Sequence, residues 1–164
     1  CSDLHSADGV TVVPGGDMRW QSVRNGVDAA GGCEWVAVHD AARPFVTAAI
    51  IDATLEKRNR YRCIIAATAE TDTIRRFEND RALETIDRRG VIRVATPQVF
   101  HRETLQGLLH DNSIDKKCIT DEAMLFEHSG IPVGIAWCES LNFKITTPAD
   151  LALAEALIEK RNTL

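Results

Sequence analysis

Short runs of apolar, β-branched residues alternate with amphipathic helical stretches along this chain, and this alternation limits the fold more than any other feature. Strands are predicted at residues 9–13, 35–38, 63–68, 91–95 and 132–137. Helices are predicted at residues 21–30, 48–59, 102–110, 121–129 and 148–158. Strands separated by helices are typical of an α/β protein whose mainly parallel sheet is flanked by helices.

Size and composition predict one globular domain over residues 1–164. Hydrophobic residues make up 45% of the chain and charged residues 26%, a balance typical of folded proteins. The net charge of −5 argues against nucleic acid as a partner. The sequence contains no apolar run long enough for a membrane span and no opening signal peptide, so no membrane partner is expected.

The five cysteines favour a reducing compartment. Their spacing forms no C-x-x-C pair and fits no zinc site. Cys63 and Cys138 lie in strand-like runs and are interpreted as small buried apolar residues. The expected location is therefore the cytoplasm, and no metal-binding residue is predicted.

Residues 70–93 form a charge-rich segment that is predicted to be a protruding β-hairpin arm. Asn79 and Asp80 are suited to its turn, and Thr73, Arg75 and Phe77 show strand-like alternation before that turn. Such a hairpin is polar on one face and needs a partner on the other. The alternative interpretation is a solvated surface loop.

The last helix carries the clearest start signal in the chain. Thr147 is placed to cap it, Pro148 occupies its first position and Asp150 completes a capping box. Its apolar residues share one face, which predicts burial of that face. These residues are Leu151, Ala154, Leu157 and Ile158.

Asp40 and Arg43 follow the predicted strand at residues 35–38 directly. Ligands of open α/β sheets bind beyond the carboxyl ends of the strands, so these two side chains are candidates for substrate binding. The small Ala41 and Ala42 between them let a ligand approach the backbone. Alternatively, Asp40 and Arg43 form an ion pair that only braces the loop.

A second candidate segment holds Gly16, Asp17 and Ser22. Glycine permits a close backbone approach to a flat base or a phosphate. The segment matches neither a Walker loop nor a G-x-G-x-x-G motif, so an ordinary strand-to-helix turn explains it as well.

Threonines and cations at the ends of other elements form a third group of candidates. Thr120 is equally suited to cap a helix, with Asp121 and Glu122 favourably set against the helix dipole. Lys144 lies between Phe143 and Ile145, where a lysine either extends to water or meets an anion. Together the group suggests a polyol phosphate site. Its members are Thr73, Arg88, Thr96, Thr120 and Lys144.

Seven ordered motifs resemble the 2-C-methyl-D-erythritol 4-phosphate cytidylyltransferase family over nearly the whole chain. They are PGGDMRWQSVRNG (14–26), VAVHDAARPF (36–45), TDT (71–73), IDRRG (86–90), ATPQVF (95–100), TDEAMLFEHSG (120–130) and NFKITTPADLALAEALI (142–158). The resemblance implies a Rossmann-like nucleotidyltransferase fold related to GT-A glycosyltransferases. It also implies CTP and methylerythritol phosphate as substrates, with Mg²⁺ bridging the nucleotide phosphates.

The resemblance further implies a role for each candidate residue. Arg88 and Lys144 match catalytic cations that position methylerythritol phosphate, and Thr73 accompanies Arg88 on an arm that reaches the second subunit of a homodimer. The polyol and its phosphate are expected to contact Asp40, Arg43, Thr96 and Thr120. The cytidine is expected to contact Gly16, Asp17 and Ser22.

The sequence departs from the family at its N-terminal end, and two alternative functions stay open beside methylerythritol phosphate cytidylyltransfer. The family begins with a strand and a glycine-rich loop that wraps the triphosphate, and neither precedes Cys1. Residues 1–164 are therefore expected to be N-terminally incomplete and to turn over little or nothing alone. The alternatives are a ribitol 5-phosphate cytidylyltransferase and a non-catalytic dimerisation module derived from the fold.

Overall fold

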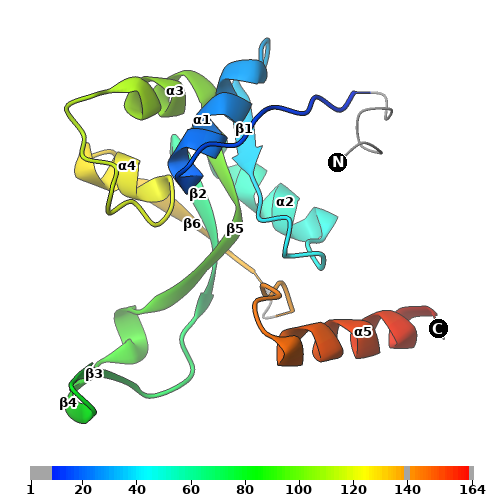
Figure 1. The fold of residues 1–164 in the computed structure, drawn as a ribbon, viewed down its shortest axis with the longest axis vertical. Coiled ribbons are helices and arrows are strands. Elements are labelled where there is room, and N and C mark those ends of the chain that lie inside the picture. Colours follow the sequence, from blue (N-terminus) through cyan, green and yellow to red (C-terminus); the bar gives the residue numbers. More distant parts are fainter. Residues whose placement is uncertain (1–8, 139–140, 163–164) are drawn as a thin grey trace. The chain divides into compact units, whose positions relative to one another are not determined.

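The computed structural model describes residues 9–138 and 141–162, and within these the backbone forms helices and strands in alternation (Figure 1). The helices, including the 3₁₀ turns η2 and η3, are α1 (Arg19–Ala29), α2 (Ala48–Leu55), η2 (Glu56–Asn59), η3 (Arg88–Gly90), α3 (Arg102–His110), α4 (Ala123–His128) and α5 (Pro148–Asn162). The strands are β1 (Trp35–Val38), β2 (Cys63–Ala69), β3 (Ile74–Glu78), β4 (Arg81–Ile86), β5 (Ile92–His101) and β6 (Val133–Trp137).

Four strands form the main sheet in the order β1-β5-β2-β6. β1 runs antiparallel to β5, with Trp35 opposite His101 and Val38 opposite Gln98. The sheet is therefore mixed, which qualifies the expectation of a mainly parallel sheet and keeps the α/β class. β3 and β4 form a separate two-stranded sheet.

The chain forms two compact units, each built from several segments. The first unit comprises Cys1–Val38, Lys57–Ile64 and Gln98–Gly134. The second unit comprises His39–Glu56, Ile65–Pro97 and Ile135–Leu164. The prediction of a single domain with an arm at residues 70–93 remains a prediction.

The core of the first unit lies between its helices and the end of β5. Helix α1 packs against α3, and α3 packs against α4. Leu105 and Leu109, one turn apart on α3, are both buried. The rings of Phe100 and Phe126 lie 5.4 Å apart in a tilted arrangement, which joins β5 to α4.

The second unit has a smaller core. Ile50, Ala66 and Ala95 form a buried cluster against which Cys138 packs. The rings of Phe45 and Phe143 stack at 5.3 Å, so the loop after β1 is held against the loop after β6. Cys63, at the start of β2 in the first unit, is buried as predicted, whereas Cys138 is only half-buried.

The strand predicted at residues 9–13 is wrong, because this segment has no regular structure. Val10 is 46% exposed and Val12 is 36% exposed. A strand needs a neighbour to satisfy its backbone hydrogen bonds, and no strand of residues 9–138 and 141–162 pairs with this segment.

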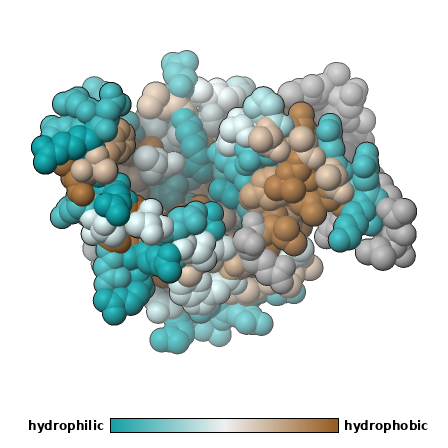
Figure 2. Space-filling model, turned by 90° about the horizontal axis from the view of Figure 1, so that it is seen from below, coloured by the Kyte–Doolittle hydropathy of each residue, from teal (hydrophilic) through white to brown (hydrophobic). Residues whose placement is uncertain are grey.

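The predicted burial of one face of α5 is also wrong over most of its length. Ala154 is buried and Leu157 is half-buried, but Leu151 and Ile158 are 49% and 47% exposed. Apolar periodicity shows which residues share a face, and burial requires a second element against that face. An apolar cluster is visible on the molecular surface in Figure 2.

The hairpin arm is confirmed, with the turn at the predicted position. Asn79 and Asp80 have φ values of 44° and 63°, the left-handed conformations that a tight two-residue hairpin turn requires. Phe77 is 79% exposed on this arm. The alternative of an unstructured surface loop is therefore wrong.

The predicted cap of α5 is present, and α2 is capped as well. The Thr47 side chain accepts a hydrogen bond from the Ile50 amide. At α5 the Asp150 carboxylate accepts from the amides of Thr146 and Thr147, and the Thr147 hydroxyl accepts from the Asp150 amide. The hydrogen bonds from Thr146 and Thr147 lower the pKa of Asp150 to about 2.

Replacing Asp150 by alanine should lower the thermal stability of the protein in a pH-dependent way. A carboxylate with a lowered folded-state pKa stabilises the fold above its unfolded pKa of about 4, and this contribution disappears as the pH falls towards 2. The difference in Tm between wild type and Asp150→Ala should therefore be largest near pH 7 and shrink between pH 4 and 2. Glu155→Ala, at an exposed position of the same helix, is the control. If the Tm difference between wild type and Asp150→Ala were the same at pH 7 and at pH 2, the capping role of Asp150 would be contradicted.

Candidate functional site

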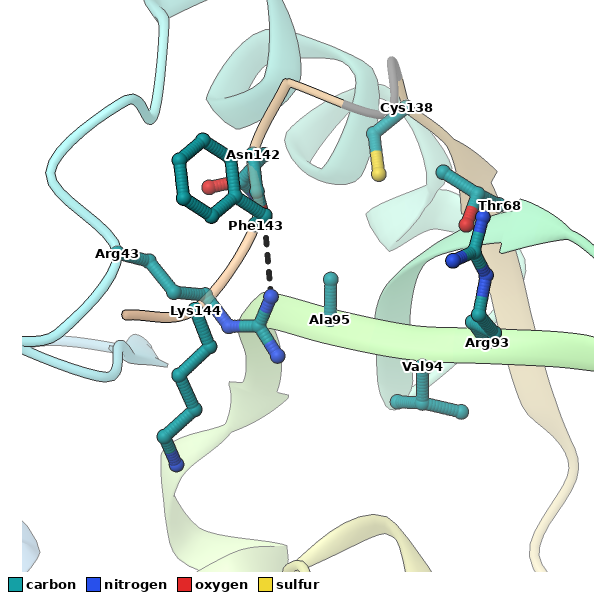
Figure 3. Close-up of a pocket in the computed structure, with 9 residues that line it drawn as sticks. All are labelled: Arg43, Thr68, Arg93, Val94, Ala95, Cys138, Asn142, Phe143 and Lys144. Atoms are coloured by element: carbon teal, nitrogen blue, oxygen red, sulfur yellow. Dashed lines mark hydrogen bonds between the residues drawn. The ribbon is translucent and has the colours of Figure 1, made fainter. Parts of the chain in front are cut away.

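A pocket of about 260 Å³ in the second unit is lined by two predicted cations and a third that was not predicted (Figure 3). Arg43 comes from the loop after β1, Arg93 from β5 and Lys144 from the loop after β6. Thr68 and Asn142 add polar groups to the lining, while the rest of it is mainly apolar. Three cations around one pocket make it suited to a small anion.

Arg43 braces two loops at the edge of this pocket. Its Nε lies 3.2 Å from Oδ2 of Asp40, and its NH1 donates to the carbonyl oxygen of Asn142 at 2.8 Å (Figure 3). The backbone adds a hydrogen bond from the Ile145 amide to the Ala42 carbonyl at 2.8 Å. The loop-bracing ion pair considered for Asp40 and Arg43 therefore exists, and it lies at the edge of the pocket.

Asp40 is the acidic centre of the group. Lys144 Nζ lies 3.3 Å from the same Oδ2 that contacts Arg43. Burial disfavours the charged carboxylate, but the contacts with Arg43 and Lys144 outweigh burial and hold the pKa of Asp40 below its usual value. Asp40 is therefore ionised at neutral pH and compensates part of the positive charge.

Thr96 holds this arrangement from β5. Its buried hydroxyl accepts a hydrogen bond from the Asp40 amide at 3.0 Å and lies 3.0 Å from His39 Nδ1. Its carbonyl accepts from Asn142 Nδ2 at 2.7 Å. Four predicted site residues therefore lie together: Asp40, Arg43, Thr96 and Lys144.

Arg88 and Thr73 lie at the base of the arm in the same unit. The Arg88 guanidinium donates to the carbonyl oxygen of Thr71. Glu70 accepts from the amides of Thr71 and Asp72, at 2.7 and 2.8 Å, and lies 3.6 Å from Arg93. The side chains of Thr73 and Arg88 are exposed, so each is accessible to a ligand or a partner.

Gly16 and Ser22 form a tight turn in the first unit. The Gly16 amide donates to Ser22 Oγ at 3.0 Å, and the Met18 amide donates to Gln21 Oε1 at 2.8 Å. A Cβ atom at Gly16 would collide with the side chain of Gln21, so the turn requires glycine. Asp17 is exposed beside it.

Thr120 lies in the first unit and does not cap α4, so the capping role considered as its alternative is wrong. Its hydroxyl contacts Met124 Sδ at 3.0 Å, and the helix starts at Ala123 with Glu122 at the cap position. The Met124 amide instead donates to Asp121 Oδ1 at 3.2 Å. A carboxylate is the stronger acceptor for an orphan helix amide, and Asp121 takes that position.

The family model for IspD, 2-C-methyl-D-erythritol 4-phosphate cytidylyltransferase, matches residues 1–160. The chain belongs to this family. It is 38% identical over 160 residues to 2-C-methyl-D-erythritol 4-phosphate cytidylyltransferase from Bacillus licheniformis, covering 96% of this chain and 69% of the relative. It is 44% identical over 154 residues to the bifunctional enzyme IspD/IspF from Anaeromyxobacter dehalogenans, covering 92% of this chain and 40% of that protein.

Solved IspD-family structures have the same fold. The 2-C-methyl-D-erythritol 4-phosphate cytidylyltransferase from Thermus thermophilus superimposes with a TM-score of 0.81 at 30% identity, covering 93% of this chain and 79% of that one. The 4-diphosphocytidyl-2C-methyl-D-erythritol synthase from Anaerococcus prevotii gives a TM-score of 0.85 at 28% identity, covering 96% and 74%. The chain spans 40% of the length of the Anaeromyxobacter dehalogenans relative and 64% of the length of the relative from Syntrophus aciditrophicus.

Three residues at this candidate site were missed in the sequence. Arg93 and Cys138 line the pocket, and buried Asn142 joins Arg43 to Thr96. Arg93 was missed because nothing in the sequence distinguishes it from an ordinary exposed cation on a strand. Asn142 begins the quoted NFKITTP motif, and a polar residue directly before Phe143 was a signal that could have found it.

Replacing Thr96 by valine should destabilise the loop that carries Asp40. Valine keeps the shape but leaves the Asp40 amide without its hydroxyl acceptor, and such a loss costs about 1–3 kcal/mol. The measurement is the free energy of unfolding in urea. Thr85→Val, at an exposed position of β4, should change it by less than about 0.5 kcal/mol. If Thr96→Val and Thr85→Val changed the free energy of unfolding equally, the hydrogen bond from the Asp40 amide to Thr96 would not be stabilising.

Proposed function

We propose that this IspD-family chain joins CTP and 2-C-methyl-D-erythritol 4-phosphate in the non-mevalonate isoprenoid pathway. A phosphate oxygen of the polyol phosphate attacks the α-phosphorus of CTP, and the bond to pyrophosphate breaks. The products are 4-diphosphocytidyl-2-C-methyl-D-erythritol and pyrophosphate. The observation that carries the proposal is the cationic pocket lined by Arg43 and Lys144, both of which pair with Asp40.

The pocket of the second unit is assigned to the polyol phosphate. Arg43 and Lys144 would bind its phosphate, because charge-assisted hydrogen bonds to an anion are about twice as strong as neutral ones. Asp40 is ionised and would accept hydrogen bonds from the polyol hydroxyls. Thr96 would position Asp40 through the backbone amide.

The arm is assigned to catalysis across a homodimer. Arg88 and Thr73 would act on the polyol phosphate of the second subunit. Their exposure at the base of the hairpin and the 79% exposure of Phe77 support this role, since an exposed aromatic side chain favours a partner surface.

The turn in the first unit is assigned to cytidine. The Gly16 backbone allows close approach of a flat base, and Asp17 and Ser22 would provide its polar contacts. Thr120, in the same unit, remains a predicted substrate-binding residue. Mg²⁺ would bind through the CTP phosphates and withdraw charge from them.

The remaining partner and location assignments are also proposals. No group of three or more His, Cys, Asp or Glu side chains suited to a metal occurs among the described residues, and no protein ligand of Mg²⁺ is assigned. Within residues 9–138 and 141–162, none of the helices has the length and apolar character to cross a membrane. The proposal places the enzyme in the cytoplasm, without a nucleic-acid partner.

The test of this function is pyrophosphate release by the full-length protein from CTP with either methylerythritol phosphate or ribitol 5-phosphate. Pyrophosphate release with methylerythritol phosphate supports the proposal. A preference for ribitol 5-phosphate would show that ribitol 5-phosphate is the polyol substrate. No release with either would favour the non-catalytic module. A parallel assay of residues 1–164 tests the expectation that they turn over little or nothing alone.

Arg88→Ala should lower kcat/KM for methylerythritol phosphate roughly ten- to a hundredfold while leaving CTP binding nearly unchanged. The loss corresponds to one charge-assisted contact of about 1.5–3 kcal/mol. Steady-state kinetics with each substrate varied in turn measure it. Arg89→Ala is the matched control, because Arg89 is exposed next to Arg88 and pairs with Asp87. Normal polyol kinetics in Arg88→Ala would reject the assignment.

A further inference from the structure

A fully buried carboxylate lies in the first unit. Glu122, at the start of α4, is 0% exposed, and Arg19 NH1 lies 2.6 and 2.5 Å from its two oxygens. Arg19 is the first residue of α1. The pair therefore joins two helix starts that are far apart in the sequence.

Stability alone is a weak explanation for this pair. Glu122 is fully desolvated and the Arg19 side chain, which is 38% exposed, is desolvated in part, so their attraction must first offset this cost. Apolar residues of similar volume often replace buried ion pairs without loss. Burial raises the pKa of Glu122, although Arg19 opposes this shift. A pair that has one fully buried partner and adds little stability is better explained by the geometry that it fixes.

Each side of the pair borders a segment assigned to a substrate. Arg19 follows the turn that the Gly16–Ser22 and Met18–Gln21 hydrogen bonds close. Glu122 follows Thr120 and Asp121 directly. The segment 120–122 has further anchors, since Gln98 Nε2 donates to Asp121 Oδ2 at 2.7 Å and the Met124 amide donates to Asp121 Oδ1.

We propose that Arg19 and Glu122 are positioning residues that fix the cytidine-binding turn relative to Thr120. Neither is assigned a substrate contact, and the inference rests on the proposed function for the identity of the two ligands. Because the segment 120–122 keeps its contacts through Asp121, loss of the pair releases chiefly the turn at residues 14–18. Loss of the pair is therefore expected to weaken the binding of CTP.

The decisive variant is the double substitution Arg19→Met with Glu122→Met in the full-length protein. It removes both charges and keeps apolar volume, so the Tm should stay within a few degrees of wild type. The KM for CTP should rise about ten- to a hundredfold, as misplaced binding groups lose affinity steeply. The KM for methylerythritol phosphate should change less than about threefold.

Two further variants keep the test decisive. Leu109→Val, in the core of the same unit, should lower the Tm without changing either KM. Arg19→Lys keeps the charge but loses the planar guanidinium, so it should raise the KM for CTP by a smaller factor than the double substitution. It also provides the measurement if the double variant does not fold.

The outcomes separate the inference from the function on which it rests. Wild-type KM values for CTP in the double variant, or in Arg19→Lys if the double variant does not fold, would show that the pair is only structural. A KM for CTP that also rises in Leu109→Val, in proportion to its loss of Tm, would overturn the inference in the same way, because the KM would then follow stability alone. Absence of pyrophosphate release by the wild-type protein would instead reject the proposed function.

Discussion

The carboxylate of Asp40 is the contact on which the second unit's site depends. One oxygen, Oδ2, lies within 3.3 Å of both Arg43 and Lys144, which come from loops about a hundred positions apart in the sequence. Without that negative charge the two cations would repel each other, and Arg43 would lose the contact that aims it at the Asn142 carbonyl. The hydroxyl of Thr96 then fixes the Asp40 backbone, so strand β5 sets the position of the whole group.

Local charge decides what the pocket can bind, in spite of the overall charge. The chain carries −5, yet Arg43, Arg93 and Lys144 surround the pocket with Asp40 as the acidic group paired to two of them. Interactions over a few ångströms in a partly desolvated pocket exceed those with distant, solvent-screened charges. A small phosphate is therefore attracted to this site even though the protein as a whole repels anions.

The sequence predicted correctly those helices, strands and turns that are determined by residues within the segment itself. The limits of β1, the limits of α3 and the Asn79–Asp80 turn followed from residues within each segment. The segment at 9–13 and the apolar face of α5 were mispredicted because a strand or an apolar face also needs a partner. Asp40, Arg43, Thr96 and Lys144 were found as candidates, but the convergence of Arg43 and Lys144 on one oxygen of Asp40 was not predictable from spacing. Asn142 and Glu122 were missed as anchors because their partners are 46 and 103 positions away.

Burial distinguishes the two acid–arginine pairs, Asp40–Arg43 and Glu122–Arg19. Asp40 is 17% exposed and faces two cations, and its pKa is lowered, so it stays charged at the edge of an accessible pocket. Glu122 is 0% exposed, and burial raises its pKa, so its charge depends on Arg19. Removing Arg43 would leave Asp40 ionised beside Lys144, whereas removing Arg19 would favour protonation of Glu122 over a buried unpaired charge. The first pair can therefore exchange contacts with a ligand while the carboxylate stays charged. The second pair keeps its geometry only while both partners remain, which is the property that a positioning pair requires.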